Sequence, residues 1–410
     1  MNNSITKNPF NIVVIVAALG YFVDIYDLIL FGIVMKPSLR DIGIADEQMF
    51  EVGGSLLGMQ MLGMLIGGIV WGILGDKKGR LSTLFLTILL YSLANIANGF
   101  VQTIEQYKWM RFIAGFGLAG ELGIGITLVS EVMTKESRGI GTSIVSGIGI
   151  AGAVLGFLVA DMFNWRVAYF VGGGLGLLLL LMRVSVHESG IFNQLKQENT
   201  QRGDFFSLFK SIKKFKKYIL CILVGVPVWY VISQLAVQSE KYAKDALQIQ
   251  GVIVGGKAVM FHYIGASIGS LIFGLISEKL KSRKKALFAA TGTMALFFVG
   301  YFMCRGASVN IFYLMIGLVG ISMGGLWAVF MANASEQFGT NMRATVTTTA
   351  PNFVRGATEL IRISITSLKG NYGLWASSFF VGAVCILLSF IAIFMSEETH
   401  GKDLDFVEEK

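Results

Sequence analysis

The stretch GMLIGGIVWGILGDKKGR, from Gly63 to Arg80, joins an apolar run to a short cluster of charges. A helix that crosses a membrane needs about 20 apolar residues, and this run with the residues before it is long enough. A similar stretch, GASIGSLIFGLISEKLKSR, runs from Gly265 to Arg283. Together the two stretches predict a membrane protein that contains a repeated unit.

The composition of the 410-residue chain supports a membrane protein. Apolar residues make up 54% of it, charged residues 15%, and the mean hydropathy is +0.66. Soluble domains carry about a quarter charged residues. The cysteines suggest no disulfide framework, and the few histidines lie far apart. We therefore expect no metal, no cofactor and no enzymatic activity.

Apolar runs predict an all-α integral membrane protein with twelve transmembrane helices. We place the helices near 11–35, 52–75, 81–100, 106–132, 139–162, 166–186, 217–240, 251–278, 285–304, 309–336, 343–368 and 372–396. Lys and Arg gather in the loops after the even-numbered spans, and basic loops stay cytoplasmic. Both termini should therefore face the cytoplasm from the cell (inner) membrane. This bias explains the net charge of +8 without a nucleic-acid partner.

The two halves of the chain align with each other. One shift superposes Gly63 on Gly265 and Asp76 on Glu278, and SEVMTKESR (Ser130–Arg138) matches SEQFGTNMR (Ser335–Arg343). A parallel duplication places the substrate site between two pseudo-symmetric six-helix bundles, near mid-membrane. The expected parts are an N-terminal bundle, a cytoplasmic linker, a C-terminal bundle and a cytoplasmic tail, over 1–186, 187–216, 217–396 and 397–410. Such a two-half bundle needs no second subunit, so we expect a monomer in the lipid bilayer.

Several motifs resemble the major facilitator superfamily across essentially the whole chain. GILGDKKGR (Gly72–Arg80) is similar to the signature loop between helices two and three. RFIAGFGLAGELGIGITLVSEVMTKESRG (Arg111–Gly139) resembles the fourth helix of the sugar-porter and organic-acid branches, and ETHGKDLDFVEE (Glu398–Glu409) the tail of sugar porters. The resemblance implies a secondary transporter that works by alternating access. GIGIAGAVLGFL (Gly147–Leu158) lacks the Gly-Pro pair of drug exporters, so export of drugs or siderophores is less favoured.

Charges around the signature loop are candidates for a gate. Asp76 ends one helix, where it can cap the N-terminus of another helix or accept hydrogen bonds from an arginine. The resemblance implies that such contacts lock the cytoplasmic face when it is shut. The candidate gating residues are Gly72, Asp76, Gly79, Arg80, Glu131, Arg138, Glu336 and Arg343. The alternative is that these charges only mark the headgroup boundary.

Ionisable residues within the spans cost about 2.5–3.5 kcal/mol each on insertion scales, so they should face a cavity or a partner. Asp24 and Asp27 of the first span lie at a height compatible with Arg111 of the fourth. In proton-linked sugar porters of the superfamily that the chain resembles, an Asp of the first helix lies beside an Arg of the fourth helix. We predict that Asp24 or Asp27 carries a proton and that Arg111 biases its release. The alternative is a permanent ion pair between the two helices.

Arg355 on the eleventh span is the first candidate for binding an anion, because its planar fork suits a carboxylate. The candidate substrate-binding residues are Arg355, Glu121, Glu359, His262 and Gln60. The alternatives are a salt bridge within the helix for Glu359 and a packing role for His262. These residues predict proton-coupled import of a small carboxylate-bearing solute. A zwitterion porter and a sugar facilitator stay open, whereas a membrane sensor would need a longer soluble segment than 187–216.

Overall fold

The computed structural model describes residues 8–183 and 202–408. Within these residues, eleven helices are long and apolar enough to cross a membrane. The N-terminal half contains α1 (Ile12–Asp41), α2 (Met49–Lys78), α3 (Arg80–Asn98), α4 (Ile104–Leu118), α5 (Glu121–Val132), α6 (Arg138–Ile150), α7 (Gly152–Met162) and α8 (Trp165–Met182). The C-terminal half contains α11 (Ile212–Tyr230), η2 (Val231–Ala236), α13 (Gly255–Leu280), α14 (Arg283–Met303), α15 (Val309–Gln337) and α16 (Arg343–Met395). Short helices α10 (Ser207–Lys210), α12 (Ser239–Lys241) and η3 (Tyr242–Ala246) complete it.

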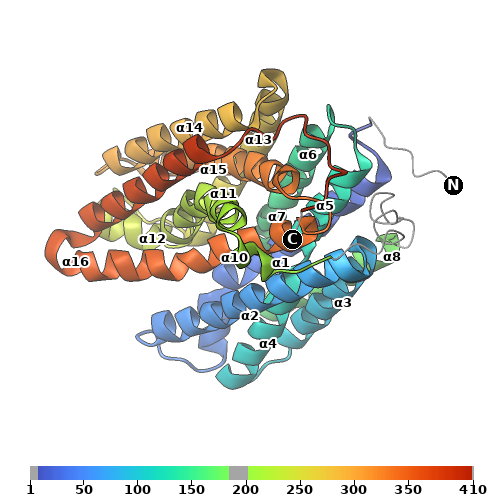
Figure 1. Ribbon diagram of the computed structural model, residues 1–410. Helices are drawn as coiled ribbons and strands as arrows, with labels where there is room; N and C mark the ends of the chain where they lie inside the picture. The colour runs from blue at the N-terminus through green and yellow to red at the C-terminus, as the bar shows by residue number, and fades with distance from the viewer. Residues whose placement is uncertain (1–7, 184–201, 409–410) are drawn as a thin grey trace.

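Helix α16 crosses the membrane twice. It has 53 residues, whereas about 20 suffice for one crossing, and its helical geometry is interrupted at Gly373 (φ 74°, ψ 168°). Glycine tolerates this left-handed conformation, so the chain turns back there, as Figure 1 shows. With α16 counted twice, the eleven helices give the twelve predicted crossings. The predicted twelve-helix fold is therefore confirmed.

Three predicted spans are each interrupted in the middle. The fourth is broken between α4 and α5 at Ala119 and Gly120, and the fifth between α6 and α7 at Ala151. The seventh passes from α11 into the π-helical turn η2, a few residues after Pro227. The break in the fourth span has a functional consequence, because it makes Glu121 the first residue of a new helix.

The repeated glycines make the same helix contact in both halves. A Cβ built on Gly63 of α2 would lie 2.9 Å from the backbone nitrogen of Phe116 on α4. A Cβ on Gly265 of α13 would lie 3.1 Å from that of Ile321 on α15. Glycine allows helices in membranes to approach this closely. The sequence repeat is therefore also a structural repeat.

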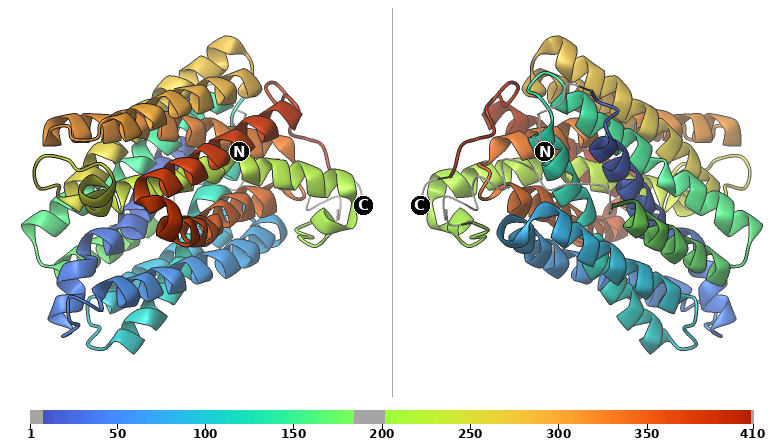
Figure 2. Two further views of the ribbon diagram at one scale, coloured as in Figure 1. Left: turned by 90° about the vertical axis from the view of Figure 1, so that its left-hand side faces the viewer. Right: turned by 90° about the vertical axis from the view of Figure 1, so that its right-hand side faces the viewer.

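The helices run side by side as one bundle. Figures 1 and 2 show α2, α3 and α4 at one edge and α13 and α14 at the opposite edge, with α1, α5 and α16 between them. The chain after α16 packs across one end of the bundle, beside the start of α11 (Figure 2). We call this end, where residues 397–408 pack, the tail face.

The predicted division into bundles, linker and tail stays a prediction. Residues 1–7, 184–201 and 409–410, which include part of the expected linker, lie outside the described residues. Helix α11 begins at Ile212, a few residues before the predicted start of the second bundle. Residues 202–211 lie at the tail face, where the backbone nitrogen of Gly203 donates to the carbonyl of Asn341 at 2.8 Å.

Candidate functional site

Four charged side chains lie buried at the centre of the bundle. Asp24 and Asp27 come from α1, Arg111 from α4 and Arg355 from α16, and each is at most 2% exposed. The oxygens of Asp24 have no hydrogen-bond partner among the described residues, and Asp27 has the side chain of Asn95 beside it. Charged groups buried in a membrane normally pair or face a transport path. This cluster is therefore a candidate binding site.

Asp27 lies in the electrostatic field of Arg111, within the N-terminal half. The guanidinium of Arg111 is held by aromatic side chains: its Nη1 donates to the hydroxyl of Tyr169 at 3.4 Å. Its carbon lies 5.4 Å from the ring centre of Phe31 and 5.6 Å from that of Tyr169. Arg111 thus neighbours Asp27 while its own hydrogen bond goes elsewhere.

Asp24 instead faces the field of Arg355, which belongs to the other half. Nη1 of Arg355 donates to Oδ1 of Asn352 at 2.8 Å, and its guanidinium carbon lies 5.6 Å from the ring centre of Trp229. Asn352 in turn donates to the carbonyl of Ala119, at the break between α4 and α5, at 3.0 Å. Arg355 is therefore fixed on one side and close to the N-terminal half.

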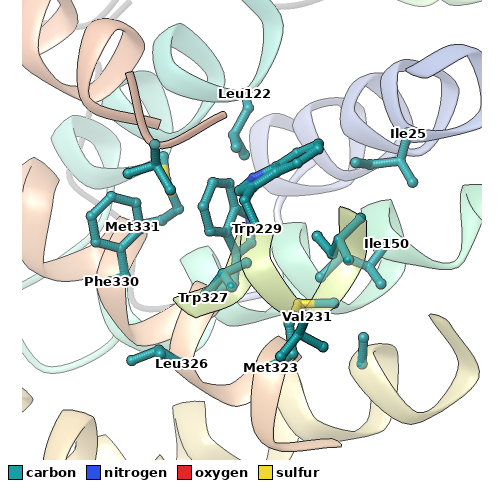
Figure 3. Close-up of a cluster of buried hydrophobic side chains, with 14 of the residues drawn as sticks. Ile25, Leu122, Ile150, Trp229, Val231, Met323, Leu326, Trp327, Phe330 and Met331 are labelled. Carbon is teal, nitrogen blue, oxygen red and sulfur yellow. The ribbon is translucent and has the colours of Figure 1, made fainter. Parts of the chain in front are cut away.

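Aromatic side chains surround these charges. Nε1 of Trp327 on α15 donates to the hydroxyl of Tyr21 on α1 at 2.9 Å, which joins the two halves. Figure 3 shows Trp229 and Trp327 in an apolar cluster that also takes Ile25 and Leu122 from the N-terminal half. A planar apolar group next to Arg355 would meet aromatic surface on the side of Trp229.

The remaining predicted substrate residues are spread more widely. Gln60 lies between α1 and α4, with Nε2 at 3.5 Å from the carbonyl of Leu28. His262 is buried and directs Nδ1 at the carbonyl of Ile316 on α15, at 3.3 Å. Both positions are internal. Gln60 contacts the backbone of Leu28, the residue that follows Asp27. Among the described residues, the hydrogen-bond contact of His262 is with the backbone of α15.

Glu121 and Glu359 do not join Arg355 in the structure. Glu359 is exposed and forms a salt bridge with Arg362 in the same helix, which is the alternative that the sequence left open. Glu121 is buried and paired with Arg183, which follows the last residue of α8. The sequence reasoning overlooked Arg183, although the residue fell within the predicted sixth span.

At the tail face, Asp76 caps the N-terminus of α16. Its carboxylate accepts from the backbone nitrogens of Ala344 at 3.1 Å and Thr345 at 2.8 Å, and from the hydroxyl of Thr345 at 2.7 Å. Arg80 lies 3.4 Å away. A carboxylate at a helix N-terminus is favoured by the helix dipole. This contact joins α2 of one half to α16 of the other.

Each half contains the same buried pair of arginine and glutamate. Arg80 donates to Glu131 at 2.8 and 3.2 Å in the N-terminal half. Arg283 donates to Glu336 at 2.8 and 3.0 Å in the C-terminal half. Arg343 crosses between the halves and donates to Glu131 at 3.1 Å. The tail face is therefore closed by charged contacts as well as by close packing.

Each of the two candidate gating glycines, Gly72 and Gly79, is required at its position for a different structural reason. A Cβ at Gly72 would lie 2.9 Å from the Cα of Thr345, so glycine permits the close approach of α2 and α16. Gly79 has φ 114°, in the region that favours glycine, and turns the chain between α2 and α3. Arg138 donates to the backbone carbonyl of Lys402 in the tail at 3.2 Å.

Comparison with known proteins identifies the family. The Major Facilitator Superfamily profile matches residues 17–357. The chain belongs to this superfamily. It is 24% identical to the niacin transporter NiaP of Acinetobacter baylyi, over 96% of this chain and 95% of that protein. It is 28% identical to the benzoate transport protein of the same organism, over 46% of this chain and 42% of that protein.

A solved structure shows the same fold. The proton:xylose symporter XylE from E. coli superposes with a TM-score of 0.77 at 14% sequence identity, covering 96% of this chain and 97% of XylE. The protein is thus a multi-pass membrane transporter of the major facilitator fold and not an enzyme. Of the buried charges, Asp24 and Arg355 face each other from the two halves of this fold.

The C-terminal tail of the transporter is held on the tail face by Glu398. Burial tends to raise the pKa of this carboxyl group. Hydrogen bonds from the hydroxyl of Ser282 and from the backbone nitrogens of His400, Arg283 and Lys284 outweigh burial, so the pKa of Glu398 lies below its ordinary value. The ionised form therefore fixes the start of the tail to the turn between α13 and α14.

Proposed function

We propose that this transporter imports a small carboxylate-bearing solute with a planar or aromatic body, together with protons. The observation that carries the proposal is the orientation of Arg355. Its Nη1 is bonded to Asn352, whereas Nε and Nη2 have no partner among the described residues. These two nitrogens form one edge of the guanidinium, the edge that binds a carboxylate with two parallel hydrogen bonds.

The surroundings of Arg355 favour an aromatic acid. The ring of Trp229 lies beside the guanidinium, and Trp327 lies in the same apolar cluster. Aromatic surfaces bind planar rings by stacked or edge contacts. Niacin and benzoate, which give two similar proteins their names, are aromatic acids of this kind.

Asp24 supplies the link to protons. It faces the same arginine from the other half, so Asp24 and a solute carboxylate would compete for the positive charge of Arg355. With solute bound, Arg355 is neutralised and Asp24 keeps its proton. Once the solute leaves, Arg355 again stabilises the ionised form of Asp24 and the proton is released. Asp27 and Arg111 form a second pair, within the N-terminal half, that can bias the same exchange.

The tail face would be the cytoplasmic face, with both termini on that side of the cell membrane. Basic residues of the loop before α11 and at the ends of α2 and α13 gather there, as expected for cytoplasmic loops. In this assignment the contacts of Asp76 and Arg343 across the halves lock the cytoplasmic side. A single chain contains both halves of the site, so the transporter works as a monomer.

Transport by purified protein in liposomes tests the proposal. Labelled nicotinate, benzoate, proline, glycine betaine and xylose are offered with and without an inward proton gradient. Wild type should accumulate an aromatic acid only with the gradient. Arg355→Gln should weaken its binding by about 10- to 150-fold, because glutamine can replace only one of the two hydrogen bonds and each contributes about 1.5–3 kcal/mol. Asp24→Asn should abolish the response to the gradient, and Arg362→Gln, an exposed arginine of the same helix, should change little.

Other outcomes would contradict the proposal. Preferred accumulation of proline or betaine would identify a zwitterion porter, for which the two buried aspartates offer sites for a cation. Uptake of xylose without any effect of the gradient would identify a sugar facilitator. Equal uptake of aromatic acids by wild type and Arg355→Gln would exclude Arg355 as the anion site.

A further inference from the structure

The ion pair between Glu121 and Arg183 is a buried charged group outside the solute site. Both side chains are 1% exposed. Glu121 is the first residue of α5 and Arg183 the residue that caps the end of α8. The positive end of one helix dipole thus faces the glutamate, and the negative end of another faces the arginine. Two helix ends stabilise the pair where water is excluded.

One face of α1 connects this pair to the central aspartates. A Cβ at Gly20 would collide with Oε1 of Glu121 and Nη2 of Arg183, so α1 packs directly against the pair. Asp24 follows Gly20 by four residues on the same face, about 6 Å along the helix, and Asp27 follows about 4.5 Å further. The three carboxylates therefore form a row: Glu121, Asp24, Asp27.

Several polar atoms along this row have no hydrogen-bond partner among the described residues. They are Oε2 of Glu121, both oxygens of Asp24 and the hydroxyl of Tyr91 on α3. Asp24 interacts electrostatically with Glu121, and Tyr91 with Glu121 and both aspartates. Within residues 8–183 and 202–408, the charged groups that face Glu121 are thus Arg183 from α8 and Asp24 from α1, with the Tyr91 hydroxyl from α3. A proton could be exchanged between acceptors in this row.

Beyond Arg183, the row leads to the tail face. A small cavity of about 10 Å³ is lined by Arg183 together with Val13, Val16, Leu81 and other apolar side chains. Val13 and Leu81 lie in the first turns of α1 and α3, at the tail-face ends of these helices. A cavity of this size is at the lower limit for holding one water molecule.

We propose that Glu121 is the proton-release site of the transporter. A proton passes from the carboxylic acid of Asp24 to the carboxylate of Glu121, which leaves Asp24 ionised and Glu121 protonated. Water at the tail face then takes the proton from Glu121, and Arg183 again pairs with the ionised glutamate. The inference rests on the proton coupling proposed above. It assigns Glu121 to the proton path, whereas the sequence suggested contact with the solute.

The proton path and the anion-binding arginine lie in different halves of the protein. Glu121, Asp24, Tyr91 and Arg183 all belong to the N-terminal half, whereas Arg355 belongs to the C-terminal half. Arg355 acts on Asp24, the inner end of the path, so solute binding decides when the proton moves. Arg183 is a positioning residue, because it acts through its ion pair with Glu121.

The test compares two kinds of transport by one protein. Proteoliposomes containing Glu121→Gln are assayed for exchange of labelled against unlabelled nicotinate or benzoate, which needs no net proton movement, and for accumulation driven by a proton gradient. We expect exchange to persist and gradient-driven accumulation to fall by about 100-fold, the scale on which a positioned proton acceptor contributes. Glu105→Gln is the matched control. It changes an exposed glutamate in the first turn of α4, and both transport modes should match wild type.

A second variant guards against a fold defect. Glu121→Gln leaves Arg183 buried without its partner, so Glu121→Gln combined with Arg183→Gln is assayed alongside it. This double variant should be as stable to heat as wild type, exchange solute and still fail to accumulate it. Accumulation restored in the double variant, or exchange and accumulation lost equally in both variants, would show a structural pair and overturn the inference. Wild-type accumulation coupled to protons, with Glu121→Gln coupled equally well, would overturn the inference and leave the proposed function standing. Wild type without any response to the gradient would overturn both.

Discussion

Replacing Gly123 with alanine should open the tail face. Gly123 lies on α5 in the N-terminal half and packs against α16 of the C-terminal half. An alanine Cβ there would lie 2.5 Å from the carbonyl oxygen of Thr347, whereas ordinary contacts begin near 3.4 Å. The obstacle is backbone, so no side-chain rotation relieves it, and the two helices must separate by about 1 Å to remove the clash.

The cost of this clash sets the size of the effect. Overpacking of a tight contact costs about 1–3 kcal/mol, which changes the ratio of closed to open tail face by about 5- to 150-fold. Gly→Ala also stabilises a helix by up to about 1 kcal/mol in either state. Gly125→Ala on the same helix controls for that gain, because its Cβ would meet nothing nearer than 3.9 Å. The difference between the two variants therefore isolates the contact between the halves.

Spin labels on Lys77→Cys and Lys279→Cys measure the opening by electron-electron double resonance. Both lysines are exposed, at equivalent positions on the tail face in the two halves, and the three native cysteines are buried. With Gly123→Ala the long-distance population should grow at the expense of the short one, whereas Gly125→Ala should leave both unchanged. The reasoning requires that α5 and α16 touch at Gly123 only while the tail face is closed. Identical distance distributions for the two variants would refute it.

Three further outcomes are expected from other contacts. Cysteines at Ser130 and Ser335, whose hydroxyl oxygens lie 3.0 Å apart across the halves, should form a disulfide on oxidation that stops transport until it is reduced. Trp229→Ala should weaken aromatic-acid binding by about 5- to 30-fold in an equilibrium binding assay, because it removes the aromatic face beside the arginine. The lowered pKa of Glu398 means that docking of the tail is complete above the ordinary carboxyl pKa of about 4.3 and is lost only as pH falls below it. A spin label at Asp405→Cys should therefore stay immobile from about pH 8 to about pH 5 and become mobile with Glu398→Gln.

Hydropathy and the repeat predicted the architecture because both follow from the membrane itself. A spanning helix must be apolar for about 20 residues whatever it packs against, so its position is visible in the sequence. Glycine at equivalent positions of the two halves indicated the same close helix contact in each, and Gly63 and Gly265 do make equivalent contacts. The placement of Asp76 at the end of a helix likewise limited its partners to groups at the same face.

The direction of side chains was not predictable in the same way. Glu359 was a candidate for contact with the solute, yet it is exposed and pairs with Arg362, three residues away. Helical spacing gives only relative angles, and which angle faces the other half depends on how the bundles dock. Arg183 was missed because an arginine just after an apolar run looks like a headgroup residue. Its partner Glu121 begins α5 after a break in the fourth span, and no residue pattern marked that break.

The structure also separates two kinds of charged contact at the tail face. The pair of Arg80 with Glu131 lies within the N-terminal half, and it need not break when the halves part. The contact of Arg343 with Glu131 crosses between the halves and must break. Removing one partner of a buried ion pair usually costs about 3–5 kcal/mol, because the other charge is left unpaired.

Here Glu131 keeps Arg80 after Arg343 has left, so opening leaves no orphaned carboxylate. The other contacts across the halves favour reversible opening for a similar reason. Thr127 and Thr347 share a hydrogen bond of 2.7 Å between their hydroxyls, and water can replace such a bond at a net cost of only about 0.5–1.5 kcal/mol. A gate built in this way holds the closed state by a few kcal/mol in total. Under the proposed mechanism, the binding of solute and proton would then be able to decide on which side the transporter is open.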